Sequence, residues 1–395
     1  MSLGWWVLAC GDPPRPVPPP PPVPTCIRHE PAWRAEEVLP VGEEVPTTTA
    51  VRVLDPDTVA LCDPRRGEVR LLHPGDWTST PIAGLGAPVR VARLAEGRLA
   101  VADIGILWPS AERVGRVLQL ERQAEGWATR VLLEGIGRVA CAEPGDLDGD
   151  GDQDLTVCEF GHLEGGLHWL ENEPPTWTLH TLARSPGWSD AWPVDLDGDG
   201  DLDLATAVSQ NEETVAIWRN AQGQFTREDV FHSPLAWFGL SSITPTDLDR
   251  DGDQDLLVSN GDTMDQDFPP GSNLDALHGL TWLENDGAGH FAPHRIFDRW
   301  GTYAARSADL DGDCDLDLAI AAHQVPAHWP GQPVRPVAWL ENDGNQNFTV
   351  HEVPGAPGQP VDLAIVGQDL LLGSLYLNED PSVRRLVLLR NATAP

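Results

Sequence analysis

The sequence predicts an all-β protein, and more specifically a seven-bladed β-propeller of four-stranded antiparallel blades. Two observations carry this prediction. An acidic string of ten residues occurs four times at a spacing of roughly 50 residues, which indicates a repeat architecture. Each copy is followed by short apolar segments separated by turn residues, and these segments fit the four strands of one propeller blade.

The four acidic strings are nearly identical. They read DLDGDGDQDL, DLDGDGDLDL, DLDRDGDQDL and DLDGDCDLDL, and they begin at Asp146, Asp195, Asp247 and Asp309. After each string come an alternating segment such as LATAVS, a variable loop, and a further segment such as LTWLEN. Turns such as NDGAGH then lead to a fourth strand, and Asn-Asp-Gly between alternating strands is a strong hairpin signal.

Three further units lack the acidic string but keep the four-strand rhythm. They begin at Val51, Val89 and Val361. Together with the four acidic units they give seven blades, which close a ring and leave no long open sheet edge. An open β-solenoid is the alternative, and both the four-strand rhythm and the number of units disfavour it.

The aspartates of each string are spaced for a cation site. Carboxylates at positions 1, 3 and 5, a backbone carbonyl at position 7 and a carboxylate at position 9 can surround Ca²⁺, which takes about 6–8 oxygen ligands. Magnesium prefers a smaller octahedral shell and fits less well. We therefore expect about four bound calcium ions, one in each string. The expected ligands are Asp146, Asp148, Asp150, Asp152, Asp154, Asp195, Asp197, Asp199, Asp201, Asp203, Asp247, Asp249, Asp251, Asp253, Asp255, Asp309, Asp311, Asp313, Asp315 and Asp317.

Position 6 of the string is glycine in three copies, because the backbone turns sharply there. Cys314 replaces the glycine in the fourth copy, where a positive φ would strain a residue with a Cβ. Position 12 is not Glu in any copy, so the strings are not EF-hands. A solvated acidic turn without metal is the alternative, and four copies in register disfavour it.

On these residues and spacings, the sequence resembles the FG-GAP or VCBS repeats of integrin-type propellers and of many bacterial secreted proteins. The resemblance extends from about Val51 to Arg390 and is specific in the four acidic units. It implies that the acidic loops join the first and second strands of a blade and lie on one face of the disc. It also implies a calcium-stabilised scaffold for adhesion or recognition, without fixing the ligand.

The N-terminal segment predicts export. The string VLAC, which ends at Cys10, resembles a bacterial lipobox, and the proline-rich stretch after it is typical of a polyproline spacer. We expect a lipoprotein signal at residues 1–9 with lipidation of Cys10, a linker and N-terminal segment at residues 10–47, and the propeller at residues 48–395. The expected location is the bacterial cell envelope, as an outer-membrane lipoprotein, or the extracellular space. An ordinary unmodified N-terminus is the alternative.

The net charge of −35 argues against nucleic acid and anionic membrane surfaces as partners, since both attract basic patches. Membrane contact is therefore expected only through an N-terminal lipid. The six cysteines do not have the pattern of a disulfide framework. Cys141 and Cys158 flank the first acidic loop and could approach each other across a hairpin; their redox state and that of Cys26 stay open. Cys62 and Cys314 are expected to be free and buried.

The loops expected on the face opposite the acidic loops are the longest and most irregular of the chain, and they are rich in Trp. Loops on a rigid ring often carry function, and exposed Trp suits stacking on sugars or anchoring peptides. We expect recognition of an extracellular protein or glycan there. The alternative for the tryptophans is that they fill the spaces between blades. The expected ligand contacts are Trp237, Trp300, Trp329, His278 and His323.

We do not expect catalysis, because the sequence contains no GxSxG, HExxH or CxxC motif. Two alternatives to recognition stay open. One is a propeller enzyme, a hydrolase or lyase, in which His and acidic residues converge at the central channel; a metal held by His278 and His323 at its mouth is one form of this hypothesis. The other is a purely structural surface component.

Overall fold

The computed structural model describes the chain in ten stretches, and the statements below concern these residues. They are residues 26, 28–38, 47–210, 212–262, 264, 268, 272–326, 331–356, 359–375 and 386–391. The expected lipidation site Cys10 and the expected ligand contact Trp329 lie outside them. No helix among the described residues is long and apolar enough to cross a membrane.

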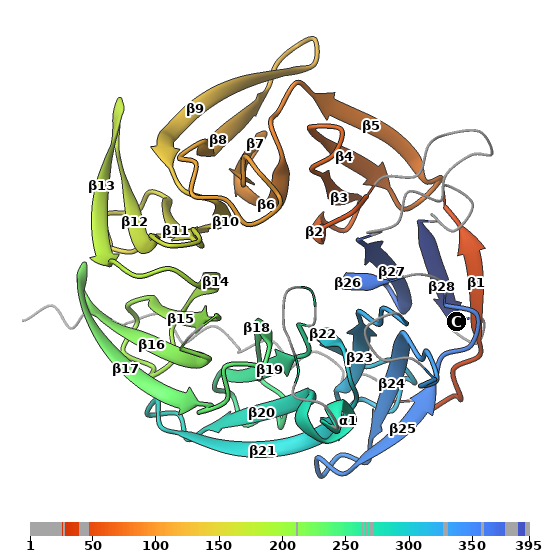
Figure 1. The fold of residues 1–395 in the computed structure, drawn as a ribbon. Coiled ribbons are helices and arrows are strands. Elements are labelled where there is room, and N and C mark those ends of the chain that lie inside the picture. Colours follow the sequence, from red (N-terminus) through yellow and green to blue (C-terminus); the bar gives the residue numbers. More distant parts are fainter. Residues whose placement is uncertain are drawn as a thin grey trace, which may run out of the picture.

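Seven four-stranded antiparallel sheets surround a central axis, which confirms the predicted seven-bladed β-propeller (Figure 1). Blades one to three consist of β2 (Ala50–Asp55), β3 (Thr58–Asp63), β4 (Glu68–His73) and β5 (Thr78–Ala83); β6 (Pro88–Ala95), β7 (Arg98–Asp103), β8 (Gly115–Arg122) and β9 (Trp127–Ile136); and β10 (Val139–Gly145), β11 (Asp154–Glu159), β12 (Gly166–Glu173) and β13 (Thr176–Ala183). Blades four and five consist of β14 (Trp188–Val194), β15 (Asp203–Val208), β16 (Thr214–Ala221) and β17 (Gln224–His232); and β18 (Leu240–Thr246), β19 (Asp255–Asn260), β20 (Gly279–Asn285) and β21 (Phe291–Asp298). Blades six and seven consist of β22 (Thr302–Ala308), β23 (Asp317–Ala322), β24 (Val337–Asn342) and β25 (Phe348–Glu352); and β26 (Pro360–Val366), β27 (Asp369–Ser374), β28 (Val387–Asn391) and β1 (Trp33–Glu37). One short helix, α1 (Leu274–Leu277), lies in the loop before β20.

Burial within a blade is greatest in the second strand and least in the fourth. The second strands β11, β15, β19 and β23 are buried along their whole length, because neighbouring blades cover both of their faces. Such strands read as continuous apolar runs rather than as alternating ones. The fourth strands, such as β13 and β21, leave much of their surface exposed.

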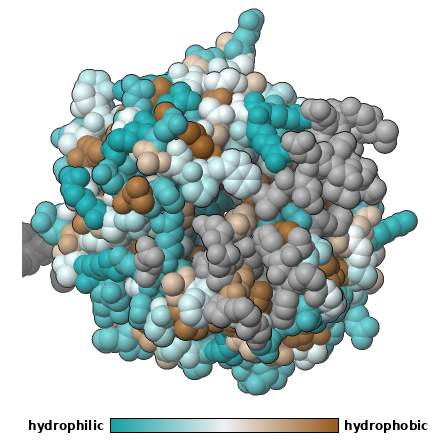
Figure 2. All heavy atoms as spheres, in the orientation of Figure 1, coloured by the Kyte–Doolittle hydropathy of each residue, from teal (hydrophilic) through white to brown (hydrophobic). Residues whose placement is uncertain are grey.

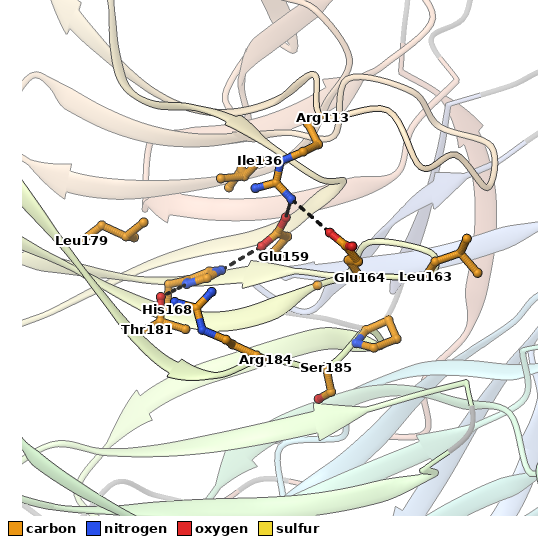
Figure 3. A pocket seen from close by; sticks show the side chains of 12 residues that line it. Arg113, Ile136, Glu159, Leu163, Glu164, His168, Leu179, Thr181, Arg184 and Ser185 are labelled. Atoms are coloured by element: carbon orange, nitrogen blue, oxygen red, sulfur yellow. Dashed lines mark hydrogen bonds and ion pairs between the residues drawn. The ribbon is translucent and has the colours of Figure 1, made fainter.

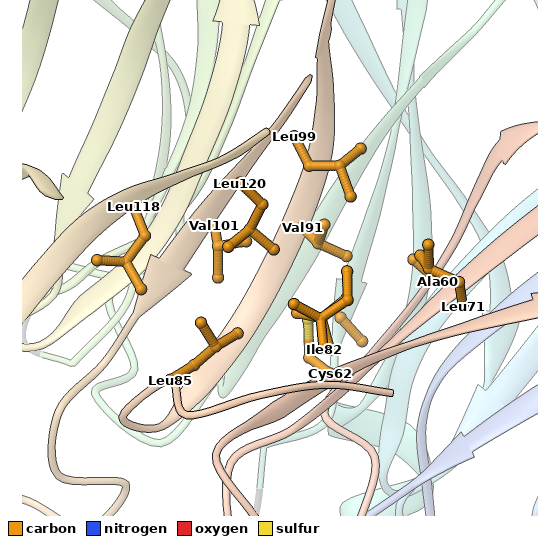
Figure 4. Packing of buried hydrophobic residues seen from close by; sticks show 12 residues of the cluster. Ala60, Cys62, Leu71, Ile82, Leu85, Val91, Leu99, Val101, Leu118 and Leu120 are labelled. Atoms are coloured by element: carbon orange, nitrogen blue, oxygen red, sulfur yellow. The ribbon is translucent and has the colours of Figure 1, made fainter. Parts of the chain in front are cut away.

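The hydrophobic core is divided into clusters that lie between neighbouring blades. Figure 4 shows the cluster between blades one and two, which includes Cys62 and Ile82 of blade one and Val91 and Leu118 of blade two. A comparable cluster joins blade seven to blade one, so that apolar packing continues around the whole ring. Stability therefore depends on contacts between blades, and no described blade buries its two faces alone.

The N-terminal strand closes the ring. Strand β1 pairs antiparallel with β28, with Trp33 opposite Asn391 and Glu37 opposite Val387, and the two strands lie side by side at the right of Figure 1. The seventh blade thus takes three strands from the C-terminal part of the chain and one from the N-terminal part. The predicted start of the propeller at residue 48 is wrong for this reason.

Two disulfides and one free thiol are present among the described cysteines. Cys141 and Cys158 are bonded across the hairpin of β10 and β11, and Cys26 is bonded to Cys314. Cys62 is free and buried, as predicted. The prediction of a free Cys314 is wrong, because the N-terminal segment returns to the fourth acidic loop and brings Cys26 beside it.

Charged side chains from the innermost strands form a polar belt at the centre of the ring. Arg52 and Arg90 both contact Glu143, at 2.8 and 2.9 Å. Arg90 also pairs with Asp190, whose second carboxylate oxygen accepts a hydrogen bond from Ile243 of blade five. On the other side of the ring, Arg306 donates to the Thr244 hydroxyl at 3.0 Å and forms an ion pair with Asp362. The Asp362 carboxylate also accepts from the backbone N–H of Val51 in blade one. The belt, which consists of Arg52, Arg90, Glu143, Asp190, Thr244, Arg306 and Asp362, therefore connects all seven blades.

Candidate metal centres and the opposite face

Each acidic string forms the loop between the first and second strands of its blade, in blades three to six. Because the four blades are built alike, the four loops emerge at corresponding places on one face of the disc. The loops between second and third strands, and the links between blades, lie at the other ends of the same strands. The strand order therefore agrees with the expected separation of an acidic face from a loop-rich face.

Three carboxylates converge in every acidic loop. In the first three loops the side chains at positions 1, 3 and 5 bring one oxygen each within 4.8 Å of the others; in the fourth loop positions 1, 3 and 9 do so. The clusters are Asp146, Asp148 and Asp150; Asp195, Asp197 and Asp199; Asp247, Asp249 and Asp251; and Asp309, Asp311 and Asp317. Three carboxylate oxygens at this separation form part of a shell suited to a hard cation.

The first aspartate of the loop also organises its backbone. The Asp146 carboxylate accepts hydrogen bonds from the N–H groups of Gly149 (2.8 Å) and Gly151 (3.0 Å). The same pair of bonds recurs in the second and fourth loops. The aspartates at positions 3 and 5 each accept from the N–H two residues further along, as Asp148 does from Asp150 and Asp150 does from Asp152. These bonds turn the backbone around the side chains that converge.

The backbone has a positive φ at position 6 of every loop, at 96° for Gly151, 94° for Gly200, 105° for Gly252 and 74° for Cys314. This agrees with the expected requirement for glycine there, and Cys314 adopts the strained conformation that its position predicted. Position 4 also has a positive φ in all four loops, including Arg250 at 62° in the third, and this requirement was not predicted.

The aspartate at position 9 has a structural role in addition to any role as a ligand. The buried Asp154 carboxylate accepts from the N–H groups of Leu147 (3.1 Å) and Asn172 (2.8 Å), which joins the loop to the third strand. Asp255 and Asp317 make the equivalent bonds in their blades. In the first three loops this carboxylate is outside the cluster of three converging oxygens, contrary to the simple five-point shell predicted.

Position 7 supplies the observation that fits a cation best. One buried oxygen of Asp152, of Asp253 and of Asp315 has no hydrogen-bond partner among the described residues. Buried oxygens without a partner are costly, and a bound cation satisfies them. The predicted ligand at this position was the backbone carbonyl, and these geometries indicate the side chain as well.

The loops concentrate negative charge, and among the described residues only Arg28 and Arg219 form ion pairs with their aspartates. Desolvation and the neighbouring carboxylates raise the pKa of Asp253 to about 6, and the same causes raise the pKa of Asp315 to about 7. Desolvation raises the pKa of Asp154 to about 6 against the hydrogen bonds from Asn172 and Leu147. A cation of charge +2 would stabilise the ionised forms, and so the donor set fits Ca²⁺.

The fourth loop differs from the others because the N-terminal segment covers it. Besides the bond from Cys26 to Cys314, the Arg28 guanidinium lies 3.2 Å from the Asp311 carboxylate and pairs with Glu341. The N–H of His29 donates to the backbone oxygen of Asp311 at 2.7 Å. This loop therefore has a covalent link that the other three lack, and a positive charge from Arg28. The second loop also has a cation beside it, because Arg219 lies 3.1 Å from the Asp203 carboxylate. Nothing in the acidic repeat itself could have predicted this cover.

The predicted ligand contacts on the opposite face differ in how much of each side chain is exposed to solvent. Trp300, His278 and His323 are 0 % exposed, so they are not available to a ligand. His278 accepts from the N–H of Gly301 at 3.4 Å, and His323 lies 3.2 Å from the backbone oxygen of Gln359. Burial lowers the pKa of His278 to about 4. His278 and His323 therefore contact the links between blades that contain Gly301 and Gln359.

Of the predicted contacts that the structure describes, Trp237 alone keeps part of its surface exposed. Trp108, in the loop between β7 and β8 of blade two, is 54 % exposed and was not among the predicted contacts. The carboxylates at the axis pair with arginines of the polar belt, which contains no His. The convergence of His and acid expected for an enzyme at the channel is therefore absent from the described belt.

Comparison with known proteins places two overlapping stretches, residues 146–206 and 195–258, in the FG-GAP-like repeat. No curated protein sequence matches the chain. Among solved structures, hydrazine synthase of Kuenenia stuttgartiensis is 12% identical with a TM-score of 0.58 and covers 90% of this chain and 98% of its own. A catalytically inactive virginiamycin B lyase of Staphylococcus aureus is 12% identical to this chain, with a TM-score of 0.57. The match covers 91% of this chain and 99% of the lyase chain.

A chain of a mitotic checkpoint complex is 12% identical with a TM-score of 0.53 and covers 98% of this chain and 99% of its own. Such different proteins at this identity show a shared fold and no shared function. The repeat matches extend from the acidic loop of blade three to the second strand of blade five. The chain is therefore a seven-bladed β-propeller that contains FG-GAP-like repeats.

Proposed function

We propose that this chain is an exported β-propeller, stabilised by calcium, that recognises an extracellular protein or glycan with the face opposite its acidic loops. The observation that carries the proposal of calcium binding is that a cluster of three carboxylates occurs in the corresponding loop of four blades. The unpartnered buried oxygens at position 7 support it independently. Calcium would hold the loops together, and the chain's own carboxylates would supply most of the ligands.

Export is supported by the two disulfides, which form and persist in oxidising compartments. Cys10 would attach the mature chain to a membrane through a lipid, and the proline-rich stretch would act as the spacer. Cys10→Ser should then release the protein from membrane fractions into the soluble fraction. A wild-type protein that is already soluble and retains Met1 by mass spectrometry would contradict lipidation.

The calcium part is tested by equilibrium dialysis of the chelator-stripped protein against calcium. We expect about four ions per chain at millimolar calcium, since sites of extracellular modules bind with Kd of about 10⁻⁴–10⁻³ M. Asp148→Asn should remove one ion and leave the others. Asp76→Asn is the matched control, because Asp76 is exposed in a turn of blade one that has no acidic string. Absence of bound calcium would refute the proposal.

The recognition part is tested on a glycan array and a panel of extracellular proteins, with millimolar calcium present. Trp108→Ala and Trp237→Ala should weaken binding with little loss of thermal stability, because these side chains are partly or mainly exposed. Trp300→Ala is the packing control, and it should lower the melting temperature since Trp300 is fully buried. If Trp108→Ala and Trp237→Ala leave binding unchanged, the opposite face is not the binding surface.

A further inference from the structure

A cavity of about 440 Å³ lies between blades two and three, on the face opposite the acidic loops. Figure 3 shows its polar residues, with Glu159 and His168 at the centre and arginines on two sides. Glu159 is the last residue of β11, whose first residue, Asp154, ends the acidic loop. The cavity and the first acidic loop are therefore at opposite ends of one six-residue strand.

Glu159 and His168 form the floor of the cavity, and hydrogen bonds hold both side chains in place. The Glu159 carboxylate accepts from the N–H of Gly137 at 2.5 Å and contacts His168 Nε2 at 3.0 Å. The other ring nitrogen of His168 lies 3.1 Å from the Thr181 hydroxyl. Desolvation opposes ionisation of Glu159, but the bonds from His168 and Gly137 prevail and lower its pKa. Both members are buried, so they shape the floor and keep its carboxylate ionised.

The rim carries two arginines that are available to a ligand. Arg113 is half exposed, and its Nε donates to the backbone oxygen of Gly135 at 3.0 Å. Its Nη1 lies 3.5 and 3.8 Å from Glu159 and Glu164, longer than the roughly 2.7–2.9 Å of a charge-assisted hydrogen bond. Arg184 is exposed, and no hydrogen bond or ion pair joins it to another described residue. Two guanidinium groups without close carboxylate partners therefore line one cavity, in a chain of net charge −35.

Aliphatic side chains surround these charges. Leu163 is 72 % exposed and Leu179 is 39 % exposed, and both line the cavity together with Ile136. In Figure 2 hydrophobic side chains are exposed among hydrophilic ones over blades two and three. Carbohydrate sites are more often walled by Trp, Tyr or Phe rings, and none of these lines this cavity. An aliphatic wall beside two arginines suits a carboxylate that carries an aliphatic neighbour.

A free strand edge borders the cavity. Strand β13 contributes Leu179 and Thr181 to the lining, and it is the outermost strand of blade three, paired only with β12. Its outer N–H and C=O groups can pair with an extended peptide, which is a common mode of peptide recognition. A peptide along this edge can place a side chain between Arg113 and Arg184.

We propose that this cavity, the blade two–three cavity, binds an extended peptide whose Asp or Glu side chain pairs with Arg113 and Arg184 while a neighbouring aliphatic residue packs on Leu163 and Leu179. This inference rests on the proposed recognition function and assigns it a site and a ligand class. The carboxylate of the peptide exchanges water for two guanidinium groups, and the aliphatic residue covers surface that is otherwise exposed to water.

The test uses an array of immobilised 12-residue peptides in which Asp or Glu is flanked by Leu, Ile or Val, and a matched array with Asn or Gln instead. The full chain in millimolar calcium should bind the acidic array and lose about tenfold or more on the amide array. Arg184→Ala and Arg113→Ala should each cause a loss of similar size, with an unchanged melting temperature for Arg184→Ala.

Arg98→Ala is the control, because Arg98 is an exposed arginine at the end of β7 near the acidic face. Equal binding to both arrays, or unchanged binding by Arg184→Ala, would overturn the inference. Binding of polygalacturonate that depends on Arg184, without peptide binding, would assign the cavity to an acidic glycan and would also overturn it. If Arg184→Ala instead leaves binding to a ligand found on the glycan array or protein panel intact, recognition stands and this cavity does not carry it.

Discussion

Removing calcium should lower the stability of the propeller by a measurable amount, and the loss should be confined to four blades. The perturbation is the transfer of the protein from millimolar calcium to a chelator. Each empty loop then keeps three carboxylates whose oxygens lie within 4.8 Å of one another, without a cation to attract them. The hairpin that each loop closes should open locally more often as a result.

The size of the loss follows from binding to the folded state. At about 1 mM calcium, a site with Kd of about 10⁻⁴–10⁻³ M adds about 0.4–1.4 kcal/mol. Four independent sites add about 2–6 kcal/mol, against a total of about 5–15 kcal/mol for a typical protein. With an unfolding entropy of about 2.1 cal/mol/K per residue over the propeller, this corresponds to about 3–8 °C in melting temperature.

The assay is differential scanning calorimetry with calcium, with magnesium and with EDTA, combined with hydrogen exchange. Exchange should rise first in residues 146–154, 195–203 and 247–255, and rise less in residues 309–317, where the Cys26 disulfide and Arg28 remain. Identical melting in calcium and EDTA would refute the reasoning. An equal increase with magnesium would show that the loops are not selective for the larger ion.

Three further predictions concern the rest of the molecule. Cys26→Ser should lower the melting temperature and raise exchange in the fourth acidic loop by freeing the N-terminal cover; an unchanged melt would show that the covalent link adds nothing. Glu143→Gln removes the carboxylate that Arg52 and Arg90 share in the polar belt, so chemical denaturation should show a loss of about 3–5 kcal/mol, and a loss under about 1 kcal/mol would contradict the role of the belt. His278 has a pKa of about 4 in the folded protein and about 6.5 when unfolded, so protonation favours the unfolded state. The free energy of unfolding should therefore fall by up to about 3 kcal/mol as the pH drops from about 6.5 to 4. His278→Asn should remove that part of the pH dependence in denaturation curves recorded across this range.

The fold was predictable because its signals are local. Every blade except the last is a continuous segment of chain, so strand rhythm and turn residues specify it without reference to distant residues. Strand β1 carries no such signal. Its sequence, WRAEE, is short and partly charged, and its partner β28 lies near the other end of the chain. Pairing of this kind depends on the closed ring, which the sequence does not display locally.

The acidic loops were predictable in outline for the same reason, and their details were not. Alternating carboxylates and glycine at position 6 are visible in the string itself. The buried oxygen of Asp253 and the hydrogen bonds of Asp255 to the third strand depend on how the loop folds against the blade. Cys26 was not predictable as the partner of Cys314, because the two residues are 288 positions apart.

The ligand face was predicted least well, because residue type does not reveal exposure in a link between blades. Trp300 and Trp108 are alike as residues, yet one is fully buried under a neighbouring blade and the other is 54 % exposed in a loop. Glu159 gave a weak signal, as an acidic residue directly after the buried run LTVC. Its pairing with His168 requires the register of β11 and β12, which the variable loop between them conceals.

The position of the blade two–three cavity connects the proposed calcium binding to the proposed peptide binding, because one strand joins the two sites. Strand β11 is held at one end by Asp154, which binds the backbone of the acidic loop and of β12, and it presents Glu159 to the cavity at the other end. The first and last residues of this six-residue strand are about 17 Å apart, and both lie within one buried strand. A cation that suppresses local opening of the β10–β11 hairpin therefore also keeps Glu159 in place at the cavity. Through Glu159 it also holds Arg113 and His168 in the positions from which they line the cavity. Because such coupling is reciprocal, a ligand in the cavity would in turn favour the folded loop and raise its affinity for calcium.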